Sequence, residues 1–406
     1  MSAVDEWLAQ RRPGWSLPQP LYLSPEVFDR DIERIFMRSW TFVGHVARIP
    51  VTGDYFLYEF GDESVVVIRT DEQAEDGAGV AAFFNVCRPR GSRVCLEDEG
   101  RAKGRLVCPY HAWTYSLDGQ WASARHMPDS FDGRGMDLHR AEVCVVEGLI
   151  FVCPRSPAPD VTGLWEHIGA TFAPYGFAEA KIAHRTTHRI RANWKIFAEN
   201  FWECYHCTHT HPEFCQVMSY PAAAESPSRQ ADYDRFVADW RETAAREGRL
   251  PADVSLEDSG LYQIGRTPIR PGFRSQSRDG NPVAPLMGEL TSYDGGISSL
   301  QMFPLNWIVA SSDHAMLFSF APIGPLETSA ELTWIVDGNA VEGRDYDPAE
   351  VSWLWEITAA EDWKICEDNQ KGVSSRVYQP GPYSQAESGI DLFVDWYLGR
   401  VRQGRR

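Results

Sequence analysis

Near the N-terminus, hydrophobic positions recur at helical spacing. Residues 24–39, SPEVFDRDIERIFMRS, place apolar side chains three or four positions apart, a period that predicts an amphipathic helix. Ser24 suits the N-cap, and the proline that follows it suits the first helical position. The expected apolar stripe consists of Phe28, Ile32, Ile35 and Phe36.

From about residue 40 to residue 155 the hydrophobic period changes to two, in short runs separated by turn residues. DYFLYEF and SVVVIRT are joined by GDE, and this arrangement predicts a β-hairpin. The further runs of this kind are VAAFFNV, GRLVCPY, AWTYSLDG and CVVEGLIFVCP. We therefore expect residues 40–155 to form a small all-β domain.

The remainder of the chain mixes both periods. The segment HRTTHRIRANWKIFAENF predicts a strand that leads into a helix, and residues 348–372 predict a long helix. Residues 220–295 are rich in Pro, Gly, Ser and Asp, which predicts long loops with short helices. Three consecutive strands are expected from ISSLQMFPLNWIVASS, AMLFSFAPIG and SAELTWIVDG.

Composition narrows the class of protein. A hydrophobic content of 43% and a charged content of 24% over 406 residues describe a globular protein of two or three domains. The net charge of −18 argues against nucleic acid and anionic lipid as partners. No apolar run predicts a membrane span and no signal peptide is visible, so we expect a cytoplasmic protein. The nine cysteines are then expected to be free or metal-bound rather than disulfide-bonded.

Two segments of the all-β region offer metal ligands. NVCRPRGSRVC contains Cys87, and CPYHAW contains Cys108 and His111. A Rieske [2Fe–2S] cluster needs two Cys on one iron and two His on the other. The position expected for the second His holds Pro89, which cannot ligate a metal; Cys95 is a conceivable substitute. The alternative is that these cysteines are buried hydrophobic residues and the histidine an ordinary loop residue.

A second candidate site lies in ENFWECYHCTHTHPEF. A mononuclear Fe(II) site that activates O₂ uses two His and one carboxylate. Glu203 and His206 share a face if this segment is helical, whereas His206 and His211 do not. Pro212 should take His211 out of the helical conformation and let its ring turn inward, which makes His209 a weaker candidate.

Other residues of this segment carry further interpretations. Cys204 and Cys207 form a C-x-x-C pair, but without a second pair they are expected to be packing residues. Asn200 could orient a ligand, or be an ordinary polar residue. The third iron ligand should be a carboxylate far along the chain, within EITAAEDWKICEDNQKG. Its candidates are Glu361, Asp362, Glu367 and Asp368, of which Asp362 lies on the more apolar helix face.

Together these motifs resemble the alpha subunits of the Rieske non-haem iron oxygenases. NVCRPRGSRVC with CPYHAWTYSLDG resembles their Rieske domain, although the family's first loop reads C-x-H-R-G. The pattern E-x-x-H-x₄-H with the later E-D-W helix resembles their mononuclear iron motif and implies His206, His211 and Asp362 as ligands. Glu203 takes the place of the acidic residue that, in the family, bridges electrons from the cluster of a neighbouring subunit.

The resemblance also implies a fold and a set of partners. It implies an α+β protein: a helical segment at residues 1–39 packs on the catalytic domain, a Rieske domain spans 40–155, and a catalytic domain spans 156–406. The catalytic domain should be an antiparallel sheet covered by helices, a helix-grip, START-like architecture. A [2Fe–2S] cluster, mononuclear Fe²⁺, O₂, an NAD(P)H-dependent reductase and a homotrimer are the implied cofactors and partners.

Within the family, ENF-x-E-C-Y-H-C-x₃-H-P and GPYSQAESGIDLF resemble the branch that acts on quaternary ammonium compounds. Such a cation suits an aromatic pocket, for which Trp202, Tyr205 and Trp307 are available, as they also are for the core. Two alternatives stay open. One is a dioxygenase of aromatic rings, and the other is a chain that cannot transfer electrons because of Pro89. The motifs leave hydroxylation and N-demethylation undistinguished.

Overall fold

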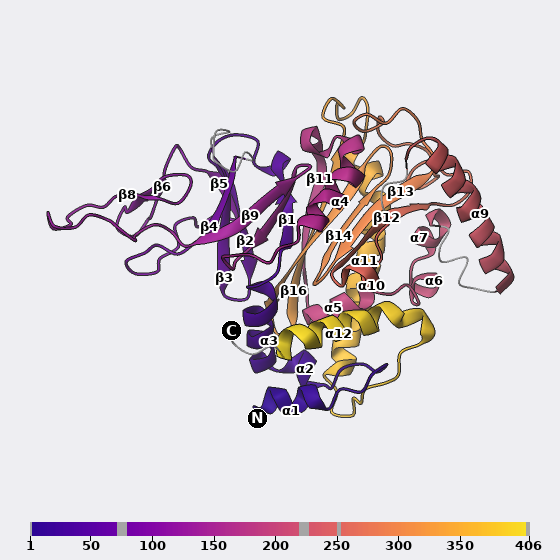
Figure 1. Cartoon of the computed structure of the whole chain (residues 1–406), viewed down its shortest axis with the longest axis horizontal. Coiled ribbons are helices and arrows are strands. Elements are labelled where there is room, and N and C mark those ends of the chain that lie inside the picture. Colours follow the sequence, from indigo (N-terminus) through magenta and orange to yellow (C-terminus); the bar gives the residue numbers. More distant parts are fainter. Residues whose placement is uncertain (1, 71–78, 219–226, 250–252, 403–406) are drawn as a thin grey trace. The chain divides into compact units, whose positions relative to one another are not determined.

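The computed structural model describes residues 2–70, 79–218, 227–249 and 253–402 of the chain. These residues form two compact units (Figure 1). One comprises Ile32–Asp160, and the other comprises Met1–Asp31 together with Val161–Arg406. No helix within the described ranges is long and apolar enough to cross a membrane.

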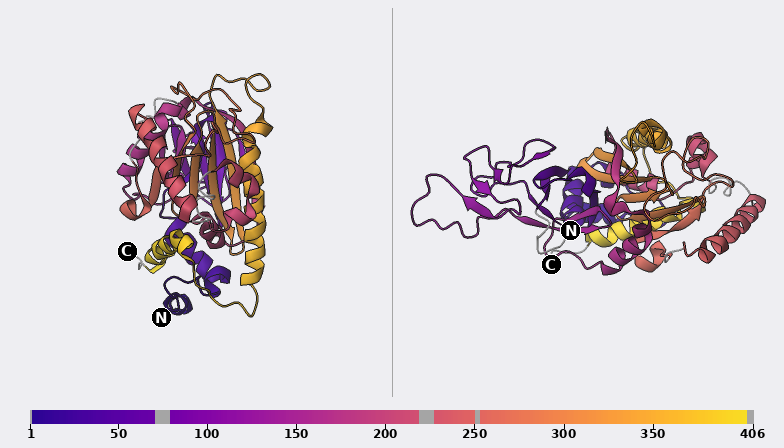
Figure 2. Two further views of the ribbon diagram at one scale, coloured as in Figure 1. Left: turned by 90° about the vertical axis from the view of Figure 1, so that its right-hand side faces the viewer. Right: turned by 90° about the horizontal axis from the view of Figure 1, so that it is seen from above.

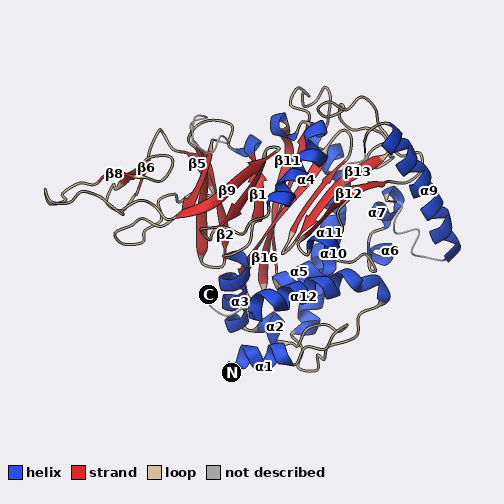
Figure 3. Ribbon diagram, viewed as in Figure 1, coloured by secondary structure: helices blue, strands red, loops and turns tan. Residues whose placement is uncertain are grey.

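The regular secondary structure of the Ile32–Asp160 unit consists mainly of antiparallel strands, joined by long loops (Figure 3). Its seven-stranded sheet has the order β1-β10-β9-β4-β3-β2-β5, and a separate three-stranded sheet has the order β6-β7-β8. The bounds are β1 Thr41–His45, β2 Asp54–Phe60, β3 Glu63–Arg69, β4 Val80–Phe84, β5 Glu99–Arg101, β6 Leu106–Val107, β7 Thr114–Tyr115, β8 Trp121–Ser123, β9 Arg140–Val146 and β10 Leu149–Cys153. The predicted hairpin is confirmed as β2 and β3.

The other unit contains a six-stranded antiparallel sheet of order β11-β16-β15-β14-β13-β12. Its strands are β11 Lys181–Ile190, β12 Tyr262–Pro268, β13 Gly296–Met302, β14 Asn306–Ala310, β15 Ala315–Gly324 and β16 Glu327–Val336. The prediction of three consecutive strands was wrong for the first run, which forms two strands. Met302 pairs with Asn306 across a tight turn at Pro304, a residue that cannot donate to a strand ladder.

Helices cover this sheet, as the α+β prediction requires (Figure 2). The bounds of the helices outside residues 194–217 are α1 Ala3–Ala9, α2 Pro20–Leu23, α3 Pro25–Asp31, α4 Thr162–Phe172, α9 Pro227–Arg246, α10 Leu256–Ser259, α11 Pro348–Val373 and α12 Ser388–Arg402. The predicted long helix at residues 348–372 is confirmed as α11, which begins at Pro348 and ends one residue later than predicted, at Val373. Its Trp355 contacts Phe318 and its Trp363 contacts Phe320 of β15, with ring centroids 6.4 and 6.5 Å apart.

The predicted helix at residues 24–39 is confirmed from Pro25 to Phe36, as α3 followed by a π-helical turn at Ile32–Phe36. At the end of α3, Asp31 is fully buried and forms an ion pair with the buried Lys195. The Trp194 indole and the Tyr397 hydroxyl also donate to Asp31, at 3.0 and 2.9 Å. The N-terminal helices are thereby anchored to two distant segments of their own unit.

The prediction for residues 220–295 was wrong in part, because α9 is a 20-residue helix. Residues 220–226 and 250–252 of this stretch lie outside the described residues. The half-buried positions of α9 recur at three- and four-residue spacing, which is a helical stripe that the surrounding Pro and Gly content obscured. They are Tyr233, Phe236, Val237, Trp240 and Arg241.

Candidate metal centre and substrate cavity

The segment that carries the candidate histidines is a series of short helices rather than one helix. The bounds are α5 Trp194–Phe201, α6 Cys207–Thr210 and α7 Pro212–Val217. Glu203 and His206 lie in the turn between α5 and α6, so the expectation that a helix face holds them together was wrong. His211, between α6 and α7, has φ −118° and ψ 74°, outside the helical region as Pro212 predicts.

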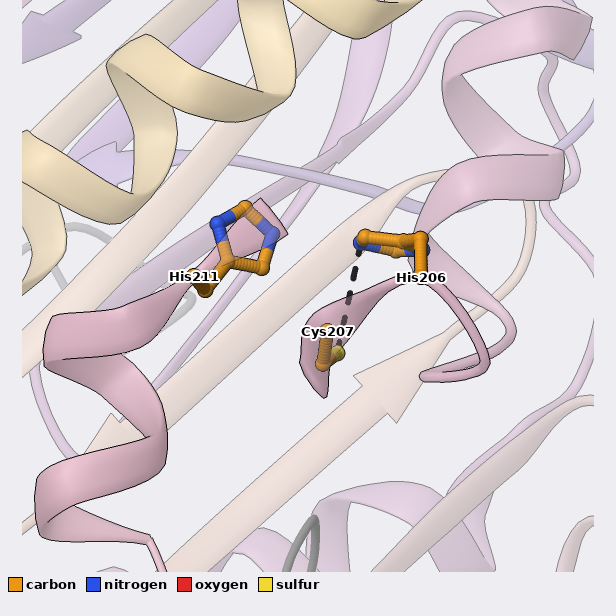
Figure 4. Close-up of side chains that lie close together, drawn as sticks. All are labelled: His206, Cys207 and His211. Carbon is orange, nitrogen blue, oxygen red and sulfur yellow. Dashed lines mark hydrogen bonds between the residues drawn. The ribbon is translucent and has the colours of Figure 1, made fainter. Parts of the chain in front are cut away.

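The structure brings His206, His211 and Asp362 together. The Nε2 atoms of His206 and His211 lie 3.3 and 3.1 Å from the same oxygen, Oδ1 of Asp362. Asp362 comes from α11, and it is 7% exposed; His211 is 1% exposed. Figure 4 shows the two imidazoles facing one another, and their ring centroids are 5.1 Å apart. A donor set of two imidazoles and one carboxylate therefore converges on one buried point.

Each imidazole is held from behind by a second carboxylate. Nδ1 of His206 lies 2.5 Å from Oε1 of Glu203, and Nδ1 of His211 lies 2.8 Å from Oε2 of Glu361. These contacts fix both rings with Nε2 toward Asp362. The sequence offered Glu361 as a candidate ligand; its own contact with Nδ1 of His211 shows that it lies behind the ring instead.

The protonation equilibria reflect this crowding of carboxylates. Burial lowers the pKa of His206, but hydrogen bonds to Asp362 and Glu203 outweigh it and raise the pKa to about 9. Burial also lowers the pKa of His211, but hydrogen bonds to Asp362 and Glu361 outweigh burial and raise this pKa above its usual value. For Asp362, burial favours the neutral acid, yet hydrogen bonds from the two histidines hold its pKa below the usual value. Without a bound cation, the site therefore favours protonated imidazoles beside an ionised carboxylate. A metal ion would displace the protons from the imidazoles.

The other acidic candidates on α11 lie away from this point. Glu367 accepts from the backbone N–H of Arg191 at 3.1 Å, and Asp368 pairs with Lys364 and Lys371 on the exposed side. His209 is exposed. The amide nitrogen of Asn200 lies 3.3 Å from Nε2 of His206, within hydrogen-bonding distance of that ring.

Cys204 and Cys207 form a disulfide, with Cα atoms 5.0 Å apart. This corrects the expectation that no cysteine would be disulfide-bonded: the turn after α5 brings the two thiols of the C-x-x-C pair into range. The sulfur of Cys207 lies 4.0 Å from Nε2 of His206 (Figure 4). Because that sulfur is bonded to Cys204, it is not a thiolate ligand, and Asp362 is the anionic donor of the group.

The donor chemistry fits ferrous iron. Two neutral imidazoles and one carboxylate form the ligand set of non-haem Fe(II) oxygenases, which leaves coordination positions for O₂. Both imidazoles are oriented by hydrogen-bonded carboxylates, as metal-bound histidines usually are.

The convergent donors open onto a cavity of about 480 Å³, within the usual range of small-molecule sites. Strands β12 to β15 form one wall, and residues of α5, α6, α7, α9, α10, α11 and the start of α12 line the remainder. Trp202 and Trp307 line this cavity as predicted, whereas Tyr205 is 63% exposed and is not among the lining residues.

Aromatic rings form a continuous path from the donors into the cavity. The ring of Phe214 lies 6.2 Å from that of His211 and 5.7 Å from that of Trp355. Trp355 in turn lies 4.9 Å from Trp307, and Trp307 stacks on Phe318 at 5.9 Å. The part of the cavity nearest the donors is therefore apolar and aromatic.

In the other unit, the candidate cluster loops are tight turns between strands. Cys87 follows β4 and is buried, and Cys108 follows β6 and is also buried. The backbone N–H of Cys87 donates to Ser92 and that of Cys108 donates to Trp113, each at 2.8 Å. Gly91 has φ +74°, a conformation that the turn requires and that favours glycine.

These loops hold three of the four Rieske donors. The hydroxyl of Tyr115 lies 3.2 Å from Sγ of Cys87, and the exposed His111 stacks on Tyr110 with ring centroids 4.0 Å apart. Pro89 is exposed and offers no donor atom. Burial raises the pKa of the Cys95 thiol to about 12, with an opposing hydrogen bond to Tyr55. The residues present do not complete the two-Cys, two-His set.

Comparisons with known proteins cover both units. Residues 177–403 match the family model described as ring hydroxylating alpha subunit (catalytic domain), and residues 39–137 match the Rieske [2Fe-2S] domain. The glycine betaine monooxygenase oxygenase subunit of Chromohalobacter salexigens is 36% identical, over 97% of this chain and 88% of the relative. The carnitine monooxygenase oxygenase subunit of Escherichia coli is 27% identical, over 92% and 88% of the two chains.

The fold is that of a solved relative. The crystal structure of the quaternary ammonium Rieske monooxygenase CntA in complex with an inhibitor superposes with a TM-score of 0.72. The two chains share 23% identity over 98% of each. The predicted architecture, a Rieske domain with a helix-covered antiparallel sheet, is thereby confirmed.

Proposed function

Because the chain belongs to the ring-hydroxylating alpha-subunit family of Rieske non-haem iron oxygenases, we propose that it is the oxygenase component of a monooxygenase for a quaternary ammonium compound. The observation that carries this proposal is the convergence of His206, His211 and Asp362 on one buried point beside an aromatic cavity. We assign these three residues as the ligands of Fe²⁺, which supplies the capacity to bind and reduce O₂.

The residues around the ligands have distinct roles in this proposal. Glu203 is the acid that bridges electrons toward His206, supported by its 2.5 Å contact with Nδ1 of that ring. Glu361 holds His211 in the orientation that presents Nε2. The buried, water-poor setting of Asp362 and His211 strengthens these contacts.

The cavity supports a cationic substrate. A quaternary ammonium group over a Trp face gains about 2 kcal/mol when both are desolvated. Trp307, Phe318 and Trp355 offer such faces near the ligands. The names of both relatives above specify quaternary ammonium substrates, glycine betaine and carnitine, which favours this class over aromatic rings.

We further propose the partners and the domain division that the family implies. Electrons come from an NAD(P)H-dependent reductase, and a homotrimer places one subunit's Rieske domain beside the next subunit's iron. Residues 1–39, 40–155 and 156–406 are the proposed N-terminal, Rieske and catalytic segments. The compact unit Ile32–Asp160 includes all of residues 40–155, which supports the two proposed boundaries of the Rieske segment.

The function is tested with anaerobically prepared full-length Pro89→His protein, in which the Rieske donor set is complete, together with ferrous iron and a reductase of a related system. We expect substrate-dependent O₂ consumption with a trimethylammonium compound, together with either formaldehyde or a hydroxylated product. The variant His206→Ala should lose bound iron and reduce O₂ consumption at least 100-fold, because it removes one of three ligands.

His209→Ala is the matched control, since this exposed histidine lies on the same segment and faces no other donor of the site. It should retain iron and turnover. Equal iron content in the His206→Ala and unmodified proteins would refute the ligand assignment.

A further inference from the structure

The cavity wall changes character along one row of the sheet. In the cross-strand register, Gln263 of β12 pairs with Gln301 of β13, Gln301 pairs with Trp307 of β14, and Trp307 pairs with Phe318 of β15. The row thus runs from two amides to two aromatic rings. Because neighbouring strands lie ~4.8 Å apart, Gln263 is about 10 Å from the Trp307 strand.

The polar half of the wall is uncharged. The side-chain NH2 of Gln263 donates to the side-chain oxygen of Gln301. This leaves the Gln263 side-chain oxygen as an acceptor and the Gln301 side-chain NH2 as a donor for a ligand. Ser299 and Thr267 line the same half, on the strands that carry the two amides. Alternation in β13 places Ser299 on the same face as Gln301.

The described residues that line the cavity include three carboxylates and no lysine or arginine. Glu203 and Asp362 are engaged with the histidines. The third, Glu257, is exposed on α10 and has no ion pair with another described residue. The segments 219–226 and 250–252 contain no Lys or Arg in the sequence. A substrate carboxylate would therefore enter without a cationic side chain to neutralise it.

From this lining we infer that the site selects a quaternary ammonium whose remaining part is uncharged and polar, such as an alcohol, amide or ester, and discriminates against a carboxylate-bearing betaine. The ammonium group lies against Trp307, Trp355 and Phe318, beside the iron ligands. The uncharged part extends along the sheet to Gln301 and Gln263, where amides and hydroxyls satisfy its hydrogen bonds. The inference rests on the proposed function and specifies its substrate class.

The physical basis is desolvation. A buried carboxylate needs a counter-charge or several dedicated donors, whereas a hydroxyl or carbonyl needs one or two neutral partners. Glu257 adds like-charge repulsion for a carboxylate and attraction for a cation.

Binding by calorimetry to the iron-loaded, full-length protein under anaerobic conditions tests the inference without electron transfer. Choline and glycine betaine share the trimethylammonium group and the two-carbon chain, and differ in carrying a hydroxyl or a carboxylate. We expect choline to bind at least tenfold more tightly. Equal affinities, or tighter binding of glycine betaine, would overturn the inference and leave the proposed quaternary ammonium function intact.

The neutral isostere 3,3-dimethyl-1-butanol keeps the hydroxyl of choline and lacks its positive charge. It therefore tests recognition of the ammonium group separately from recognition of the polar end. It should bind at least tenfold more weakly than choline. If it binds as well as choline, or if neither cation binds, the proposed function itself fails.

Gln301→Arg places a cation in the polar half and should shift the affinity ratio at least tenfold toward glycine betaine. Gln301→Glu is the matched variant with the opposite charge and should shift the ratio further toward choline. An unchanged ratio in both variants would show that the substrate's polar end does not lie on this wall, and would overturn the inference.

Discussion

At the scale of single residues, the main anomaly is Pro89 beside an otherwise well-formed pair of cluster loops. Cys87 and Cys108 are buried on tight turns, and His111 follows Cys108 three positions along the chain. A proline offers neither a donor atom nor a backbone N–H. Everything else in the loop geometry is compatible with a cluster, so one side chain decides its ligand set.

Pro89→His is therefore expected to increase the iron and acid-labile sulfide content and to produce a Rieske-type EPR signal on reduction. The reason is that a second imidazole completes the two-Cys, two-His set, whose potential lies at about −150 to +300 mV. Metal analysis and EPR of anaerobically purified protein measure both quantities. Pro89→Ala is the control, because it relieves the proline constraint without adding a donor.

A Rieske signal of full intensity in the unmodified protein would contradict this expectation. A different donor would then complete the set. His139 would be the first to test, because its ring contacts the guanidinium of Arg88, next to Pro89.

At the scale of elements, α11 contributes two adjacent acids to one imidazole. Asp362 approaches Nε2 of His211 and Glu361 approaches Nδ1. Adjacent helical residues point about 100° apart, so the ring of His211 fits between the two carboxylates. The helix phase thus determines which acid contacts Nε2 and which contacts Nδ1.

Glu361→Ala should weaken the binding of divalent metal about 10- to 100-fold, the usual effect of removing the partner of a metal-bound imidazole. Competition titration of metal-free protein with Co²⁺ measures this without turnover. Glu361→Gln should recover part of the affinity, because the amide oxygen still accepts from Nδ1.

Asp368→Asn provides the control on the same helix, since its partners Lys364 and Lys371 are exposed. It should bind Co²⁺ as the unmodified protein does. Undiminished affinity in Glu361→Ala would mean that the packing around His211 is enough to orient the ring.

At the scale of the whole molecule, one buried ion pair joins the N-terminal helices to the segment that carries the candidate histidines. Asp31 and Lys195 are both fully buried, and Lys195 belongs to α5, the helix that leads to Glu203 and His206. Removing one member of a buried pair leaves the other charged and unpaired, at a cost of about 3–5 kcal/mol.

Lys195→Met should accordingly lower the free energy of unfolding by about 3–5 kcal/mol, measured by urea denaturation. The double variant Asp31→Asn/Lys195→Met should lose less, because no buried charge is left unpaired. The amide oxygen can still accept from the Trp194 indole, and the amide NH2 can donate to the Tyr397 hydroxyl. Lys364→Met, at an exposed ion pair, should cost no more than about 1 kcal/mol. A loss in Lys195→Met as small as in that control would show that the pair contributes nothing net.

Local sequence determined much of the fold and of the candidate site. Period-two runs marked the strands of the Ile32–Asp160 unit, and capping and helical period marked α3 and α11. Pro212 predicted the break at His211, because the residue before proline avoids the helical conformation. These features depend on nearest neighbours along the chain, which is why they could be predicted from the sequence.

Tertiary structure decided what depends on residues far apart. Glu361, Asp362, Glu367 and Asp368 are four acids of one segment, and the helix face favoured Asp362. Only the packing of α11 against the sheet showed that this carboxylate meets both imidazoles. The same applies to the uncharged row of Gln263 and Gln301, since strand register, and not local preference, places them beside Trp307. Convergence of distant side chains is set by the sum of many packing contacts, so a local pattern can rank the candidates but cannot show which of them meet.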